Sequence, residues 1–167
     1  VPGRIAGFEA ALIEAAARPD SQARLQGLLD ASTSAAEGLS QASRGVQELR
    51  ERADREISQL VGDLNTGLQN VADLNANILR AKASGRDFSA LLDQRQQAID
   101  RVAEIVPIQV LPRDNGSATL ITPTGAVLVD TRAAEFEFSA RSIITPDMTQ
   151  TSGALSGLTL NGIDIST

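Results

Sequence analysis

The sequence predicts an α+β fold, in which a long antiparallel coiled-coil-like helical rod precedes a small antiparallel β meander with hairpins. Residues 20–80 contain no proline and repeat apolar or small side chains every three or four positions, close to the 3.5-residue period of coiled coils. From Pro107 onward the period changes to two, which is typical of strands. Aromatic residues make up only 2% of the 167 residues. Narrow helix seams therefore suit this composition better than a thick core.

The helical rod is expected to occupy residues 1–106 and to contain three helices, over about 3–17, 20–80 and 88–106. The first helix carries Ile5, Phe8, Leu12 and Ala16 on one face. Because its connector, "RPD", is short, we expect a hairpin or sharp corner before the long helix. Asp20 is expected to cap that helix by accepting from the unpaired N–H groups of its first turn.

The long helix would measure about 90 Å at 1.5 Å per residue, more than a globular domain needs. Its glycines each weaken an isolated helix by about 1 kcal/mol relative to alanine, so it depends on packing partners. A generic coiled coil and a rod segment of a polymer both fit this periodicity. The apolar or small stripe consists of Leu25, Leu28, Ser32, Ala35, Leu39, Ala42, Val46, Leu49, Ala53, Ile57, Leu60, Leu64, Leu68, Val71, Leu74 and Ile78.

The third helix follows a break at Gly85 and contains the stretch "DFSALLDQRQQAID". Asp87 is placed to cap it, and the short loop implies that it folds back antiparallel on the end of the long helix. Asp93 with Gln97, or Gln97 with Arg101, lie four residues apart and are expected to pair. This polar stretch is therefore interpreted as a folding joint and not as a reactive site.

The β-rich region is expected over residues 107–167. Asn115-Gly116, Pro123 with Gly125, and Asn161-Gly162 are turn signals. They indicate a meander of three or four strands and, after a loop, a separate hairpin. Glu135 and Glu137 alternate with two phenylalanines and are interpreted as the solvated face of a strand. The strands are expected at about 107–112, 117–122, 126–131, 135–140, 157–160 and 163–166.

The composition argues against most chemistry. Without His or Cys, and with Lys82 as the single lysine, the chain lacks the usual general base, metal ligand and thiol nucleophile. We therefore expect no enzyme activity, no catalytic residues, no cofactor and no metal. The net charge of −6 argues against nucleic acid as a partner, and no apolar run is long enough to predict a membrane span.

A recognisable pattern consists of Leu91, Leu92, Asp93, Gln94 and Arg95, which open a helix, and the later "GAVLV" strand at residues 125–129. By this pattern the segment from Leu91 to Val129 resembles the flagellar hook-associated protein 1 family, the first of two junction proteins between bacterial hook and filament. The upstream stretch "RIAGFEAALIEAAARPDSQARLQGLLDAS" and "VADLNANI" at residues 71–78 are similar to the family as well. The resemblance covers most of residues 4–140.

The resemblance implies a structural subunit that forms a ring with its own copies and contacts the hook protein and the second junction protein. It implies export by the flagellar type III apparatus to an extracellular flagellum, and an export chaperone bound by a C-terminal region outside this chain. The chain is accordingly expected to be an internal fragment. Two other interpretations stay open, a coiled-coil interaction module unrelated to flagella and a relative of the neighbouring junction protein or flagellin.

Overall fold

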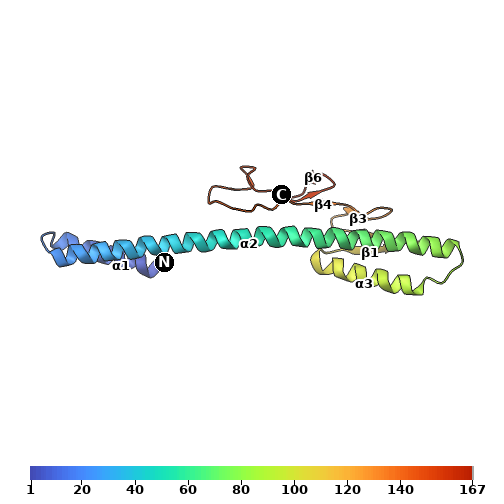
Figure 1. Ribbon diagram of the computed structural model, residues 1–167, viewed down its shortest axis with the longest axis horizontal. Coiled ribbons are helices and arrows are strands. Elements are labelled where there is room, and N and C mark those ends of the chain that lie inside the picture. The colour runs from blue at the N-terminus through green and yellow to red at the C-terminus, as the bar shows by residue number, and fades with distance from the viewer. Residues whose placement is uncertain (167) are drawn as a thin grey trace. The chain divides into compact units, whose positions relative to one another are not determined.

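The computed structural model describes residues 1–166 and has the expected α+β fold, drawn in Figure 1. The chain forms two compact units. One consists of Val1–Arg52 with Ile143–Pro146, and the other of Ala53–Ser142 with the segment from Asp147 onward. A single helix contributes residues to both units. No helix among residues 1–166 is both long and apolar enough to cross a membrane.

In the first unit, α1 (Pro2–Ala17) lies antiparallel to the first part of α2 (Gln22–Ala83), as the short connector predicts. Arg4 Nη1 donates to the Ser34 carbonyl (3.1 Å) and Arg24 Nη1 to the Glu14 carbonyl (2.8 Å). These two bonds fasten opposite ends of the helix pair. Side-chain to backbone bonds therefore add to the packing of this hairpin.

Two expectations for the first unit are wrong. The Ser21 carbonyl accepts from the Arg24 and Leu25 N–H groups, which makes Ser21 the N-cap of α2 and leaves Asp20 outside the helix. The packed face of α1 is also rotated from the expected one, because Ala15 is its buried residue while Leu12 is exposed. Alanine permits a closer approach of two helix backbones than leucine does.

In the second unit, α3 (Ser89–Ile105) turns back along the C-terminal part of α2. Leu68 and Val71 of α2 pack with Ile99 and Val102 of α3 in one apolar core. A Cβ built at Gly67 would lie 2.8 Å from Val102 Cγ2, so the two helix backbones meet closely there. The expected antiparallel fold-back of this helix is confirmed.

The β region forms two three-stranded antiparallel sheets. Sheet A has the order β1-β2-β3 and sheet B the order β4-β5-β6. The segment expected as a strand at 135–140 contributes two residues and joins sheet B, so the meander has three strands. The strands are β1 (Gln109–Pro112), β2 (Ala118–Ile121), β3 (Val127–Val129), β4 (Phe136–Glu137), β5 (Thr159–Leu160) and β6 (Ile163–Asp164).

The two Asn-Gly pairs form different turns. Asn161 (φ 51°) and Gly162 (φ 79°) both have positive φ and connect β5 to β6 directly, as a two-residue primed turn requires. At Asn115-Gly116 only the glycine has positive φ (95°). There the Arg113 N–H donates to the Ser117 carbonyl across a longer loop. The same dipeptide therefore closes two kinds of hairpin.

Candidate functional site

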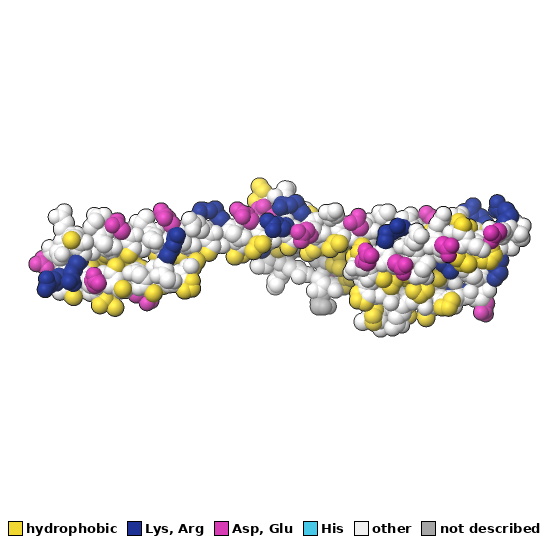
Figure 2. Space-filling model, turned by 90° about the horizontal axis from the view of Figure 1, so that it is seen from below, with side chains coloured by type: hydrophobic (Ala, Val, Ile, Leu, Met, Phe, Trp, Pro, Cys, Tyr) yellow, Lys and Arg dark blue, Asp and Glu magenta, His cyan; other side chains and the backbone are white. Residues whose placement is uncertain are grey.

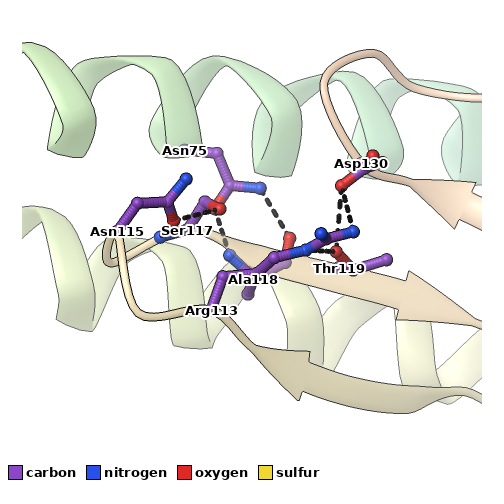
Figure 3. Close-up of polar contacts among 7 residues, drawn as sticks. All are labelled: Asn75, Arg113, Asn115, Ser117, Ala118, Thr119 and Asp130. Carbon is purple, nitrogen blue, oxygen red and sulfur yellow. Dashed lines mark hydrogen bonds and ion pairs between the residues drawn. The ribbon is translucent and has the colours of Figure 1, made fainter.

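The joint between the helices and sheet A is organised by Asn75 of α2, which is only 3% exposed. Its side-chain Nδ2 donates to the Ala118 carbonyl (2.7 Å), and its Oδ1 accepts from the Ala118 N–H (3.0 Å). Figure 3 shows both bonds between the helix and the first residue of β2. One side-chain amide thus satisfies both backbone groups of Ala118.

This pairing follows from the register of sheet A. β2 is the central strand, but β3 pairs only with Leu120 and Ile121. At Ala118 the edge of β2 that faces away from β1 therefore has no neighbouring strand. Unpaired backbone groups are costly when buried. The Asn75 amide takes the place of the missing strand at this edge.

Arg95 of α3 completes the joint. Its Nη1 donates to Asn75 Oδ1 (3.0 Å) and to the Gly116 carbonyl (2.8 Å). The side chain is half-buried, and burial lowers the pKa of the guanidinium from its ordinary value. An arginine remains charged under these conditions, so both bonds are charge-assisted and comparatively strong. Asn75, Arg95, Gly116 and Ala118 are called the clamp below.

A second asparagine of α2, Asn65, forms the same pair of side-chain to backbone bonds with a residue of sheet B. Asn65 Nδ2 donates to the Phe136 carbonyl (2.7 Å), and Asn65 Oδ1 accepts from the Phe136 N–H (2.9 Å). On the other side, the residue before β4, Glu135, bonds to Asn161. The Asn161 backbone N–H donates to the Glu135 carbonyl (2.8 Å), and the Glu135 N–H donates to Asn161 Oδ1 (2.9 Å). β4 is therefore held between α2 and the C-terminal hairpin.

Further contacts attach the β region to α2. Residues later in the β region bond to positions nearer the N-terminal end of the helix. Lys82 Nζ donates to the Asp114 carbonyl (3.0 Å), near the C-terminal end of the helix. Asp54, which is buried, accepts from the Arg141 N–H at the other end of this unit. Asn75 and Asn65 lie between them. The second unit is thus held together by a series of side-chain to backbone bonds in addition to its apolar core.

A second polar group, also drawn in Figure 3, links the residue after β1, a residue of β2 and the residue after β3. Arg113 donates through Nε to Thr119 Oγ1 (2.8 Å) and forms an ion pair through Nη2 with Asp130 (2.8 Å). Thr119 Oγ1 donates in turn to the Asp130 carboxylate (3.0 Å). The ion pair is about half exposed, so it contributes little to stability.

The five motif residues divide between the seam and the surface. Leu91 and Leu92 are half-buried, Asp93 and Gln94 are exposed, and Arg95 is part of the clamp. The two expected pairs are replaced by Gln96 with Asp100 (2.8 Å). That pair has the same four-residue spacing and lies on the solvent side of α3.

Asp87 caps α3 from one position further out than expected, since Phe88 is the N-cap residue. The Asp87 carboxylate accepts from the Ser89 N–H (3.0 Å) and the Ser89 hydroxyl (2.8 Å). These two bonds, the backbone one first, lower the pKa of Asp87 below its ordinary value. The carboxylate thus still satisfies one N–H group of the first helical turn.

Sequence reasoning missed Asn65 and Asn75, although a signal was present. The tripeptide Asp-Leu-Asn occurs twice in α2, at residues 63–65 and 73–75. An asparagine that recurs beside a leucine of the apolar stripe indicates a polar group with a fixed partner in an otherwise apolar seam. The partner itself depends on the register of two sheets, which the sequence of the helix does not contain.

The surface of this unit holds open grooves. One, of about 530 Å³, lies between α2 and α3 and includes Asp63, Arg101 and Glu104 among its lining residues. Residues 1–166 contain no group of three or more acidic, histidine or cysteine side chains that could hold a metal ion. Glu135 and Glu137 are exposed while Phe136 is buried, as expected for a solvated strand face. The geometry of the joint is suited to fastening elements together.

Comparisons with known proteins bear on the fold and the family of this chain. No curated protein matches the sequence significantly. A solved structure of the flagellar hook junction protein FlgK from Burkholderia pseudomallei has the same fold, with a TM-score of 0.76 and 17% sequence identity. The match covers 99% of this chain and 28% of that protein, so the chain spans less than a third of its length. The model of the flagellar hook-associated protein FlgK helical domain matches residues 1–163. Since that match includes nearly every residue, the chain belongs to the FlgK family of flagellar hook-associated proteins and corresponds to their helical domain.

Proposed function

We propose that this chain is the helical domain of a structural subunit that joins hook and filament in the bacterial flagellum and serves there as a mechanical adaptor. The observation that carries the proposal is the clamp. Two of the stretches that resemble the junction family, residues 71–78 and 91–95, contribute Asn75 and Arg95, which bond to each other. Part of the family signature thus lies where α2, α3 and sheet A are bonded together.

The proposal includes the partners and the location of the whole protein. The subunit forms a ring with its own copies, contacts the hook protein on one side and the second junction protein on the other, and lies outside the cell. Export proceeds through the flagellar type III apparatus with a chaperone that binds another part of the protein. The role is structural and requires no catalytic group.

The surface of the first unit supports a role in assembly. Leu39, Val46 and Leu49 of α2 and Ile13 of α1 are each more than half exposed. Figure 2 shows hydrophobic side chains at the surface over α1. Exposed apolar patches of this kind mark contact surfaces. The family match argues against a coiled-coil module unrelated to flagella, which would present a similar helical surface.

The test is genetic. Deleting the full-length gene should leave hooks without filaments and release flagellin into the medium, and the wild-type gene should restore filaments. The Asn75→Ala variant should restore them incompletely, whereas Gln94→Ala, an exposed neighbour of the clamp, should act as wild type. Normal filaments in the deletion strain would contradict the proposal.

A further inference from the structure

Two asparagines of this chain precede a glycine, and both are exposed, at Asn115 and Asn161. In an Asn-Gly pair the glycine backbone nitrogen can attack the side-chain amide of the asparagine, because glycine has no side chain that keeps the two groups apart. Whether it reacts in a folded protein depends on how the asparagine is held. The structure holds the two asparagines differently.

At Asn115 the side chain folds back over the Gly116 peptide. Its Oδ1 accepts from the Ser117 N–H (2.9 Å) and from the Ser117 hydroxyl (2.8 Å), as Figure 3 shows. When a nucleophile adds to Cγ of the Asn115 side-chain amide, negative charge develops on Oδ1. Two donors already in place would stabilise that charge, as oxyanion holes do. The bond from the Ser117 N–H also closes a ring that contains the attacking Gly116 nitrogen, which restricts the motion of the side chain relative to it.

At Asn161 the side chain is drawn in another direction. Its Oδ1 accepts from the N–H of Glu135 (2.9 Å), a residue of a different segment. The Asn161 backbone N–H also donates to the Glu135 carbonyl (2.8 Å). Both groups of Asn161 are thus directed toward Glu135, the residue before β4, and neither bond connects the side chain to the residues that follow Gly162. Asn161 is therefore an internal control with the same dipeptide.

We propose that Asn115 is a site of spontaneous deamidation, favoured over Asn161 by its bonds to Ser117. The Gly116 N–H first leaves the Arg113 carbonyl, to which it donates at 2.9 Å. The Gly116 nitrogen then loses its proton and forms a bond to Asn115 Cγ. The side-chain nitrogen departs as ammonia after taking a proton, which leaves a five-membered succinimide. Water adds to one of the two ring carbonyls and breaks its bond to nitrogen. The products are aspartate or isoaspartate.

The modification would act on the clamp. Isoaspartate routes the main chain through the former side chain and lengthens the loop between Arg113 and Ser117 by one carbon. Within that loop the Gly116 carbonyl accepts from Arg95, and the next residue, Ala118, is bound by Asn75. Isoaspartate at position 115 would therefore displace backbone groups on which the clamp depends. This inference does not depend on the proposed function.

The experiment is a time course of the purified 167-residue chain at mildly alkaline pH, with each Asn-Gly peptide and its isoaspartate form quantified by mass spectrometry. We expect Asn115 to react faster than Asn161 by about fivefold, the factor that corresponds to one net hydrogen bond. Ser117→Ala, which keeps the backbone donor, should slow Asn115 alone. Asn115→Gln should abolish the reaction at this position.

The same time course in denaturant separates fold from local sequence. There the two asparagines should react at similar rates, and Ser117→Ala should have little effect. A rate at Asn161 equal to or above that at Asn115 in the folded protein would overturn the proposal. So would an Asn115 rate that Ser117→Ala leaves unchanged, or a preference for Asn115 that persists fully in denaturant.

Discussion

α2 has two stretches, residues 22–52 in the first unit and residues 53–83 in the second. They carry similar apolar stripes but bury them to very different degrees. In the first unit Val46 is 52% exposed and Leu49 is 61% exposed, whereas Leu68, Val71 and Ile78 in the second unit are fully buried. The difference lies in what covers the helix. α3 and the sheets supply an apolar core to the second stretch. A stripe therefore identifies the face of a helix that can pack, while its neighbours decide whether that face is buried.

The second stretch also carries polar side chains with fixed partners. Asn65 and Asn75 close the open edges of the two sheets, at Phe136 and Ala118. A buried amide is tolerated only where its donors and acceptors are satisfied. Substitutions of apolar and of polar residues should thus both lower the free energy of unfolding more in the second stretch than in the first.

The largest expected effect separates the two stretches directly. Leu68→Ala should destabilise the 167-residue chain by about 2–5 kcal/mol, because it leaves a cavity in a packed core. Leu49→Ala should change stability by no more than about 0.5 kcal/mol, as exposed substitutions generally do. Urea unfolding of the two variants measures both values. Equal losses would show that the stripe packs alike along the whole helix.

The next effect separates the two asparagines. Asn75→Ala should cost about 2–4 kcal/mol, since it leaves the backbone groups of Ala118 unpaired in a buried place and removes one acceptor of Arg95. Asn65→Ala should cost about 1–2 kcal/mol, because Asn65 is only half-buried and water can replace part of its bonds. Unfolding midpoints of both variants test this order. A reversal would mean that sheet B, and not sheet A, anchors the unit.

A pair of glycines in α2 should respond with opposite signs. Gly67→Ala should destabilise by about 1–3 kcal/mol, because its Cβ would overlap Val102 and force the helices apart. At Gly62 nothing lies within 4 Å of the added Cβ, so Gly62→Ala should stabilise the helix by up to about 1 kcal/mol. Thermal unfolding of the two variants distinguishes them. If both stabilise, α3 does not pack closely at Gly67.

The smallest effect is a pH dependence. Hydrogen bonds from Ser89 lower the pKa of Asp87, and those from Ser166 lower the pKa of Asp164, both below the ordinary 3.8. The folded state thus holds these protons less tightly than the unfolded state does. Their stabilisation is complete above the ordinary value and is lost as the pH falls below it. In urea titrations at neutral and acidic pH, a double Asp87→Ala, Asp164→Ala variant should lose less stability in acid than the wild type. An equal loss of stability in acid would show that neither carboxylate contributes to the pH dependence.

Much of the fold could be predicted from local patterns. The helices follow from periodicity, the fold-back of α3 from the short loop at Gly85, and the hairpins from Asn-Gly pairs. The division of the strands between two sheets could not be predicted, because β4 pairs with a strand more than twenty residues later. For the same reason the clamp escaped detection. Arg95 was identified from its motif, but its bonds to Asn75 and Gly116 depend on three segments meeting in space.

The most direct test of the clamp is hydrogen exchange at the Ala118 amide, measured by NMR in the wild type and in Asn75→Ala. The adjacent Thr119, which lies opposite Leu111 of β1, serves as the internal reference. If the Asn75 amide replaces a missing strand, exchange at Ala118 should accelerate at least tenfold more than at Thr119, a factor that corresponds to about 1.4 kcal/mol. Equal acceleration at both amides, or an unchanged rate at Ala118, would contradict the assigned role of Asn75.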